Sequence, residues 1–158
     1  MFWWVLAACG GGEPTDDGSA SLTDTGPFSG TLALSFQISA ELIEVLDPPE
    51  TAAGTFYGSI YRNDEVNSFG PIEGATALGD LEIVLDLGSS GGPVGPVLVT
   101  DELPVDIVVI LGFLDTDANH TDYSPDSGDP VTLPGQNKFQ VEADAETPAT
   151  VLFSLLNP

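Results

Sequence analysis

The chain of 158 residues is long enough for one domain with a real hydrophobic core but cramped for two. Its 25 acidic residues face 2 cationic ones, Arg62 and Lys138, and the formal net charge of −23 excludes nucleic acids as partners. Such a charge serves solubility or attracts divalent cations, and the sequence leaves both open. Gly and Pro make up about a fifth of the residues, which favours short elements joined by turns.

The N-terminus carries a short apolar segment that ends in the chain's single cysteine. Residues 2–8 are too few to span a bilayer, which needs about 20, but they suffice for the core of a signal peptide. The motif Leu6-Ala7-Ala8-Cys9 resembles the lipobox of bacterial lipoproteins. This resemblance implies that residues 1–8 are a signal peptide and that the Cys9 thiol carries a diacylglycerol.

Residues 9–27 then predict a flexible tether, because they are rich in Gly, Ser, Thr and Asp. The residue after the cysteine is Gly10, and in this position the sequence resembles lipoproteins that are passed on to the outer membrane. We therefore expect a protein anchored by lipid to the cell envelope, facing the periplasm or the surface. A signal peptide begins with Lys or Arg, but neither residue precedes Cys9 in this sequence. Either the true start lies upstream, or the segment is an ordinary apolar N-terminus with a free thiol.

Residues 28–158 show the pattern of an all-β domain. Large apolar residues recur at every second position, which places them on one face of a strand. The run from Ile107 to Leu114 is continuously apolar and predicts a central strand covered on both faces. Ala40 to Leu46 is expected to form a helical turn that Pro48 and Pro49 end. Six to eight short strands predict a single antiparallel β-sandwich. They lie at residues 32–38, 56–61, 81–87, 107–114, 139–141 and 151–155.

Two of these segments carry a resemblance at the level of the fold. Gly54 to Arg62 forms a first strand, and Thr100 to Asp115 joins a Leu-Pro turn to a central strand and an aspartate loop. This order resembles prealbumin-like sandwiches, the group with Cna-B-type and carboxypeptidase-regulatory-like modules. The resemblance implies a stalk, spacer or binding platform rather than an enzyme.

The aspartate loop from Asp115 to Asp129 packs five aspartates into fifteen positions. Ca²⁺ takes six to eight oxygen ligands, and carboxylates at alternate positions of a tight loop can turn inward together. Counted from Asp115 as position 1, the loop departs from the usual calcium pattern at two places. Position 6 is His120, where Gly is normal, and position 12 is Asp126, where Glu is normal. The alternative is a solvated acidic loop that needs no ion. The expected ligands are Asp115, Asp117, Asn119, the Thr121 carbonyl and Asp126, with Asp122 and Asp129 in reserve.

Enzymatic sites find little support in the sequence. His120 is the one histidine, and no Gly-rich phosphate loop or zinc spacing is present. Many carboxylates are available to a hydrolase, but no pair stands out. We therefore expect no enzymatic activity.

Aromatic residues give a second class of function. Tyr57, Tyr61, Phe69 and Tyr123 form a candidate recognition patch of the kind that sugar-binding sandwiches use, although packing within the fold is the commoner role of such residues. The leading hypothesis is a structural or interaction module with a structural Ca²⁺ loop, attached to the membrane through its lipid. The alternative is a carbohydrate- or ligand-binding domain. The sequence does not identify a protein or carbohydrate partner.

Overall fold

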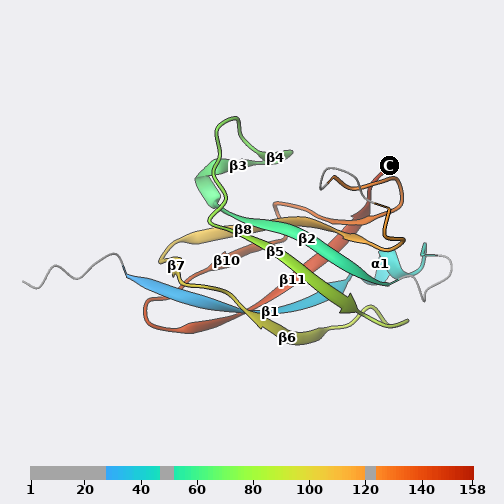
Figure 1. Cartoon of the computed structure of the whole chain (residues 1–158), viewed down its shortest axis with the longest axis horizontal. Coiled ribbons are helices and arrows are strands. Elements are labelled where there is room, and N and C mark those ends of the chain that lie inside the picture. Colours follow the sequence, from blue (N-terminus) through green and yellow to red (C-terminus); the bar gives the residue numbers. More distant parts are fainter. Residues whose placement is uncertain (1–27, 47–51, 120–123) are drawn as a thin grey trace, which may run out of the picture.

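The computed structural model describes residues 28–46, 52–119 and 124–158, and these residues form an all-β domain (Figure 1). Two short helical elements, α1 (Ala40–Ile43) and the 3-10 turn η2 (Asn63–Glu65), accompany the strands. The strands are β1 (Ser29–Ile38), β2 (Ala53–Arg62), β3 (Val66–Asn67), β4 (Gly70–Pro71), β5 (Gly79–Asp86), β6 (Val94–Val99), β7 (Leu103–Pro104), β8 (Ile107–Asp115), β9 (Pro130–Thr132), β10 (Lys138–Gln140) and β11 (Glu146–Leu156).

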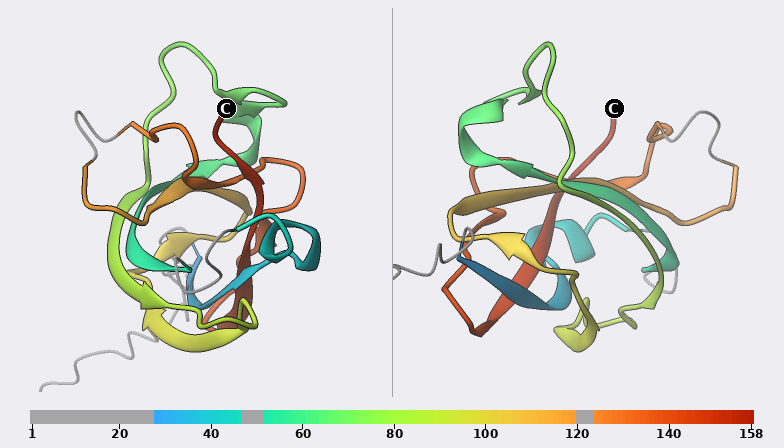
Figure 2. Two further views of the ribbon diagram at one scale, coloured as in Figure 1. Left: turned by 90° about the vertical axis from the view of Figure 1, so that its right-hand side faces the viewer. Right: turned by 60° about the vertical axis from the view of Figure 1, so that its left-hand side comes forward.

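Nine of these strands join one sheet with the order β5-β2-β8-β9-β11-β1-β6. In addition, β10 pairs with β8 and β7 with β1, while β3 and β4 form a separate small hairpin. The sheet curls around its own core, so that its two ends approach each other (Figure 2). The all-β prediction is confirmed. The division into two packed sheets that defines a sandwich stays a prediction, because hydrogen bonds here link the strands into one continuous sheet.

The sheet is mixed, and in this respect the wholly antiparallel prediction was wrong. β1 pairs with β11 in parallel, from Thr31 opposite Glu146 to Ile38 opposite Phe153. A parallel pair needs a long crossover between its strands, and almost the whole domain lies between these two. Local alternation reports which face of a strand is buried but not the direction of its neighbour.

The apolar alternation placed most strands correctly. Phe36, Phe56 and Phe153, from β1, β2 and β11, are fully buried and meet with ring centroids 5.1–6.3 Å apart. The helical turn is also confirmed, and the Ser39 side chain caps it by accepting a hydrogen bond from the Leu42 N–H. β6 was missed because Pro96 interrupts it. Its position at the end of the sheet order explains why a proline is tolerated there.

Candidate functional site

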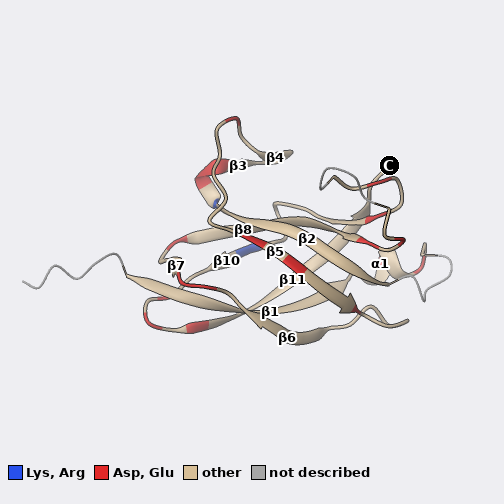
Figure 3. Cartoon of the chain, viewed as in Figure 1, with Lys and Arg blue, Asp and Glu red and all other residues tan. Residues whose placement is uncertain are grey.

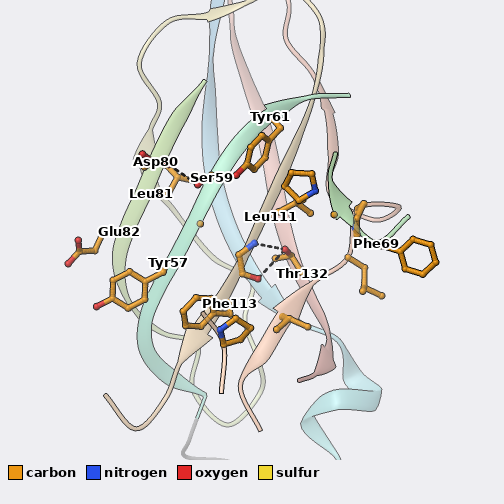
Figure 4. Close-up of a pocket in the computed structure, with 18 of the residues that line it drawn as sticks. Tyr57, Ser59, Tyr61, Phe69, Asp80, Leu81, Glu82, Leu111, Phe113 and Thr132 are labelled. Atoms are coloured by element: carbon orange, nitrogen blue, oxygen red, sulfur yellow. Dashed lines mark hydrogen bonds between the residues drawn. The ribbon is translucent and has the colours of Figure 1, made fainter. Parts of the chain in front are cut away.

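An open groove of about 910 Å³ lies on the outer face of the sheet (Figure 4). Its volume falls in the range of sites that hold small ligands. Phe56 and Ile60 of β2 point into the core, so the tyrosines and the serine that alternate with them point outward and form the floor of the groove. Four aromatic residues line it: Tyr57, Tyr61, Phe69 and Phe113.

The floor is built by cross-strand neighbours of Tyr57. Phe113 of β8 lies directly opposite Tyr57, and the two ring centroids are 5.7 Å apart at an interplanar angle of 34°. Glu82 of β5 lies opposite Tyr57 on its other side. Aromatic side chains therefore occupy the β2–β8 part of the groove, and carboxylates border it along β5.

Ser59 and Asp80 form the next cross-strand pair along this border. The Ser59 hydroxyl donates a hydrogen bond to Asp80 Oδ1 over 2.7 Å, drawn as a dashed line in Figure 4. Asp80 and Glu82 are separated by one residue of β5, so both side chains are on the groove side of that strand. Both carboxylates are solvent-exposed.

The opposite wall of the groove comes from β9 and is fixed by a side chain. Thr132 Oγ1 accepts a hydrogen bond from the Gly112 N–H at 2.8 Å and donates one to the Gly112 carbonyl at 3.2 Å. Phe113 and Val131 make the one ladder pair between β8 and β9. The threonine hydroxyl thus extends a short ladder and holds the wall against the floor.

The segment between β2 and β5 overhangs one end of the groove. These strands are antiparallel neighbours that a two-residue turn could join, yet residues 63–78 lie between them and include the β3–β4 hairpin. Phe69 near the tip of this hairpin is 97% exposed. In Figure 4 its ring points away from the other labelled aromatic residues. Binding residues often lie on loops of this kind, which a rigid sheet holds in position.

The predicted aromatic patch is therefore partly assembled. Tyr57, Tyr61 and Phe69 line one groove, whereas Tyr123 lies outside the described residues. Phe113 was missed because it lies in a continuous apolar run that gives no alternation signal. Glu82 and Asp80 were missed because only the pairing of β5 with β2 brings them to the groove.

A cluster of three aspartates lies next to the groove. Asp115 ends β8, Asp117 follows it, and Asp129 directly precedes β9. Each offers a carboxylate oxygen, and these oxygens lie within 4.8 Å of one another. Asp115 and Asp129 are each only 3% exposed, and Asp117 is exposed. This cluster could hold a metal ion.

Backbone and side-chain hydrogen bonds close the loop around the cluster. The Ala118 N–H donates to Asp115 Oδ1 at 2.8 Å, and the Asp126 N–H donates to Asp129 Oδ2 at 2.9 Å. Asn157, just after β11, fixes the other side. Its side-chain amide donates to the carbonyls of Pro125 and Asp126, and its backbone N–H donates to the Asp129 carbonyl.

Burial and like charge act together on Asp129. Burial raises the pKa of Asp129, and the negative charges of Asp115 and Asp117 raise it further, against backbone hydrogen bonds from Asp126 and Thr116 that lower it. Ionised carboxylates this close repel one another, so the cluster favours either a bound proton or a cation.

Neither Arg62 nor Lys138 lies close enough to neutralise the aspartate cluster. Arg62 lies opposite Val108 and Lys138 opposite Val109, at the start of β8, whereas Asp115 ends it. Asp115 lies six positions beyond Val109 along the extended strand, a distance of about 20 Å. Figure 3 shows both cationic positions at the other end of the sheet from the loop. Arg62 contacts Asp106 instead, at 3.6 Å.

The cluster differs in membership from the predicted ligand set. It contains Asp115, Asp117 and the reserve residue Asp129, but not Asp126. Asp126 contributes its backbone N–H and carbonyl to the closure of the loop. Asn119 donates a hydrogen bond from Nδ2 to Asp117 Oδ2 at 2.7 Å. The remaining predicted positions, Thr121 and Asp122, and also His120, lie outside the described residues. Ligation itself stays a prediction.

No protein-family model, curated protein or solved structure matches this chain. Within the described ranges, no helix has the length and apolar character that crossing a bilayer requires. The geometry of the groove and of the aspartate cluster is therefore what bears on function.

Proposed function

We propose that this protein is a non-enzymatic carbohydrate-binding module, held at the bacterial cell envelope by a lipid on Cys9. The observation that carries the proposal is the pair of tyrosines, Tyr57 and Tyr61, on the floor of one groove. Phe113 is buried against Tyr57, and Phe69 lies on the hairpin at one end of the groove. Sugar rings present apolar C–H faces that pack on aromatic rings, while their hydroxyl groups need hydrogen-bond acceptors at the edge. The carboxylates of β5 supply such acceptors.

The polarity of the groove supports a sugar over other small ligands. Its described lining contains carboxylates and hydroxyl groups but no Lys, Arg or His, so an anionic ligand meets repulsion there. A purely apolar ligand would leave Asp80 and Glu82 without a function. Tyr57 and Tyr61 are four residues apart on one strand, a span of about 13 Å. A short chain of sugar rings fits such a span better than a single ring does.

Binding of neutral oligosaccharides, measured by isothermal titration calorimetry, tests this proposal. Tyr57→Ala removes a stacking surface, so we expect affinity to fall by about fivefold to tenfold. Tyr61→Ala serves as a second variant, and the melting temperature of each shows whether it folds. Val84→Ala is the control, because Val84 is exposed on the neighbouring strand but does not line the groove. Absence of binding across a panel of neutral glycans, or equal binding by the folded tyrosine variants, contradicts the proposal.

We further propose that Asp115, Asp117 and Asp129 hold a structural Ca²⁺. Two buried carboxylates beside a third, with both cationic side chains of the chain far away, support this role. The loop that would be stiffened adjoins the groove, since Pro125 lines the groove and Asp129 leads directly into β9. An ion here would stabilise a wall of the binding site rather than take part in a reaction.

The lipid anchor is tested by mass spectrometry of the protein extracted from membranes. We expect the mature chain to begin at Cys9 and to carry a diacylglycerol, with the protein in the outer-membrane fraction. Cys9→Ser should release the protein from that fraction. An unmodified thiol at Cys9 in the native protein contradicts the anchor and leaves the groove proposal standing.

A further inference from the structure

The border of the groove carries negative charge next to an aromatic ring. Glu82 lies directly opposite Tyr57 in the β2–β5 ladder, and side chains in such a pair start about 5 Å apart. Figure 4 shows both residues on the same side of the sheet, with Glu82 at the outer edge beside Tyr57. Glu82 is exposed, and no described residue makes an ion pair with it. Its carboxylate is therefore available to a ligand that packs on Tyr57.

A second carboxylate extends this charge along the same edge. Asp80 follows at a spacing of two residues on β5, about 7 Å away along the strand. The Ser59 hydroxyl occupies its Oδ1 atom, which leaves Oδ2 for another donor. Arg62, the nearest cationic residue in sequence to the groove floor, contacts Asp106 and does not line the groove. The described lining therefore leaves the charge of this edge without a cationic partner.

We propose that the groove selects sugars that bear a protonated amine, with the ammonium group placed between Glu82 and the Tyr57 ring. An ammonium is attracted both by a carboxylate and by the face of an aromatic ring within about 6 Å. A hydroxyl or N-acetyl group at the same position offers a hydrogen bond but no charge. The net charge of −23 adds a long-range attraction for cationic ligands. This inference rests on the proposed carbohydrate-binding function.

The test compares two ligands that differ in charge but share a backbone. The probes are a tetramer of β-1,4-linked glucosamine and its fully N-acetylated counterpart, titrated calorimetrically at pH 5.5 and low salt. We expect the amine form to bind about tenfold more tightly, because a cation–π contact and an exposed ion pair each contribute a few-fold. In high salt the preference should shrink to about twofold, since screening weakens exposed charge pairs.

Glu82→Gln identifies the residue responsible. It keeps the shape and one hydrogen-bond acceptor but removes the charge, so we expect the ratio of the affinities for the amine and the N-acetylated tetramer to fall towards one in this variant. Asp86→Asn is the matched control: Asp86 is exposed on the same strand but does not line the groove, and the preference should persist.

The possible outcomes separate this inference from the proposed function. Equal binding of both tetramers by the native protein overturns amine selection and leaves carbohydrate binding intact. Binding of neither tetramer, nor of any neutral glycan, removes both. Tight binding of tetralysine that competes equally with the amine tetramer also overturns the inference, because the groove would then take any polycation. Persistence of the preference in Glu82→Gln excludes Glu82 as its source.

Discussion

Gly58 and Gly112 lie directly opposite each other in β2 and β8, and the Phe56 ring packs against both. A Cβ atom on Gly112 would lie 2.6 Å from Gly58 Cα and 2.6 Å from Phe56 Cε2. The absence of both side chains leaves room for the ring beneath the strand pair. The groove depends on this packing, because Tyr57 and Phe113 are the adjacent residues on the opposite face of the same strands.

Gly112→Ala is therefore expected to destabilise the domain by about 1–3 kcal/mol, since an added methyl group overpacks a close-packed core. Urea denaturation measures the change in the free energy of unfolding. Gly79→Ala is the matched control, because a Cβ at Gly79 meets nothing within 4 Å. Its effect should stay within about 0.5 kcal/mol or be slightly stabilising. Equal stability of the two variants would show that the close approach of β2 and β8 is misplaced.

Phe69 offers a substitution that should affect binding without affecting the fold. Because its side chain is 97% exposed, Phe69→Ala should change the free energy of unfolding by no more than about 0.5 kcal/mol. A sugar chain long enough to pass from Tyr57 to the β3–β4 hairpin would meet this ring. We expect a severalfold loss of affinity for a tetrasaccharide and no loss for a disaccharide, measured by calorimetry. A uniform loss for both lengths would place Phe69 at the centre of the site instead.

Local sequence patterns predicted which face of each strand is buried but not which strands pair with each other. The alternation of β2 places Tyr57 and Tyr61 on one face of the strand and Phe56 on the other. The structure confirms that Phe56 is buried while both tyrosines line the groove. Glu82 reaches the groove because the register between β2 and β5 places it opposite Tyr57. The local pattern of either strand does not reveal that register. The groove could thus be half predicted from the sequence, and its charged edge could not.

The same limit applies to the aspartate loop. Its spacing favoured Asp126 as the last ligand, because counting along a loop assumes that the backbone wraps the ion evenly. Asn157, which follows the last strand, instead binds the backbone carbonyls of Pro125 and Asp126. Asp129, a reserve ligand of the predicted set, lies in the cluster. Spacing along the loop does not reveal the contact between Asn157 and Asp126, which spans 31 residues, and ligation by Asp126 or by Asp129 stays a prediction.

Asn137 has a structural role that the sequence did not indicate. Its fully buried side chain accepts a hydrogen bond from the Leu152 N–H at 2.7 Å and donates to the Leu152 carbonyl at 3.0 Å and the Leu133 carbonyl at 3.1 Å. Asn137→Leu leaves these backbone groups unsatisfied, so we expect a loss of about 3 kcal/mol or more. Gln136→Leu, at the exposed neighbouring position, should cost less than about 1 kcal/mol in the same denaturation assay. Similar costs would contradict the bridging role.

The raised pKa of Asp129 predicts a pH dependence in the absence of divalent cations. A group whose pKa is higher in the folded state contributes stability below its ordinary value near 3.8 and loses that contribution as pH rises through the folded pKa. In EDTA, Asp129→Asn should therefore be more stable than the native protein at pH 7, with the difference closing towards pH 4. The melting temperature across this range measures it. Asp126→Asn is the control, because the Asp126 carboxylate lies outside the cluster. A native protein that is the more stable of the two at pH 7 in EDTA would contradict the electrostatic account.

Calcium should reverse that order of stability. With a dissociation constant of about 10⁻⁴–10⁻³ M, as in extracellular calcium modules, about 10 mM Ca²⁺ stabilises the native protein by about 1.4–2.7 kcal/mol. Asp129→Asn and Asp117→Ala each remove a carboxylate ligand, so both should lose most of this gain, whereas Asp126→Asn should keep it. Asp117 is the more informative position, because its exposed side chain can be truncated with little effect on packing. A native melting temperature that is the same in Ca²⁺ and in EDTA would show that the cluster is neutralised by protons alone. A full calcium response in Asp117→Ala would place the ion elsewhere.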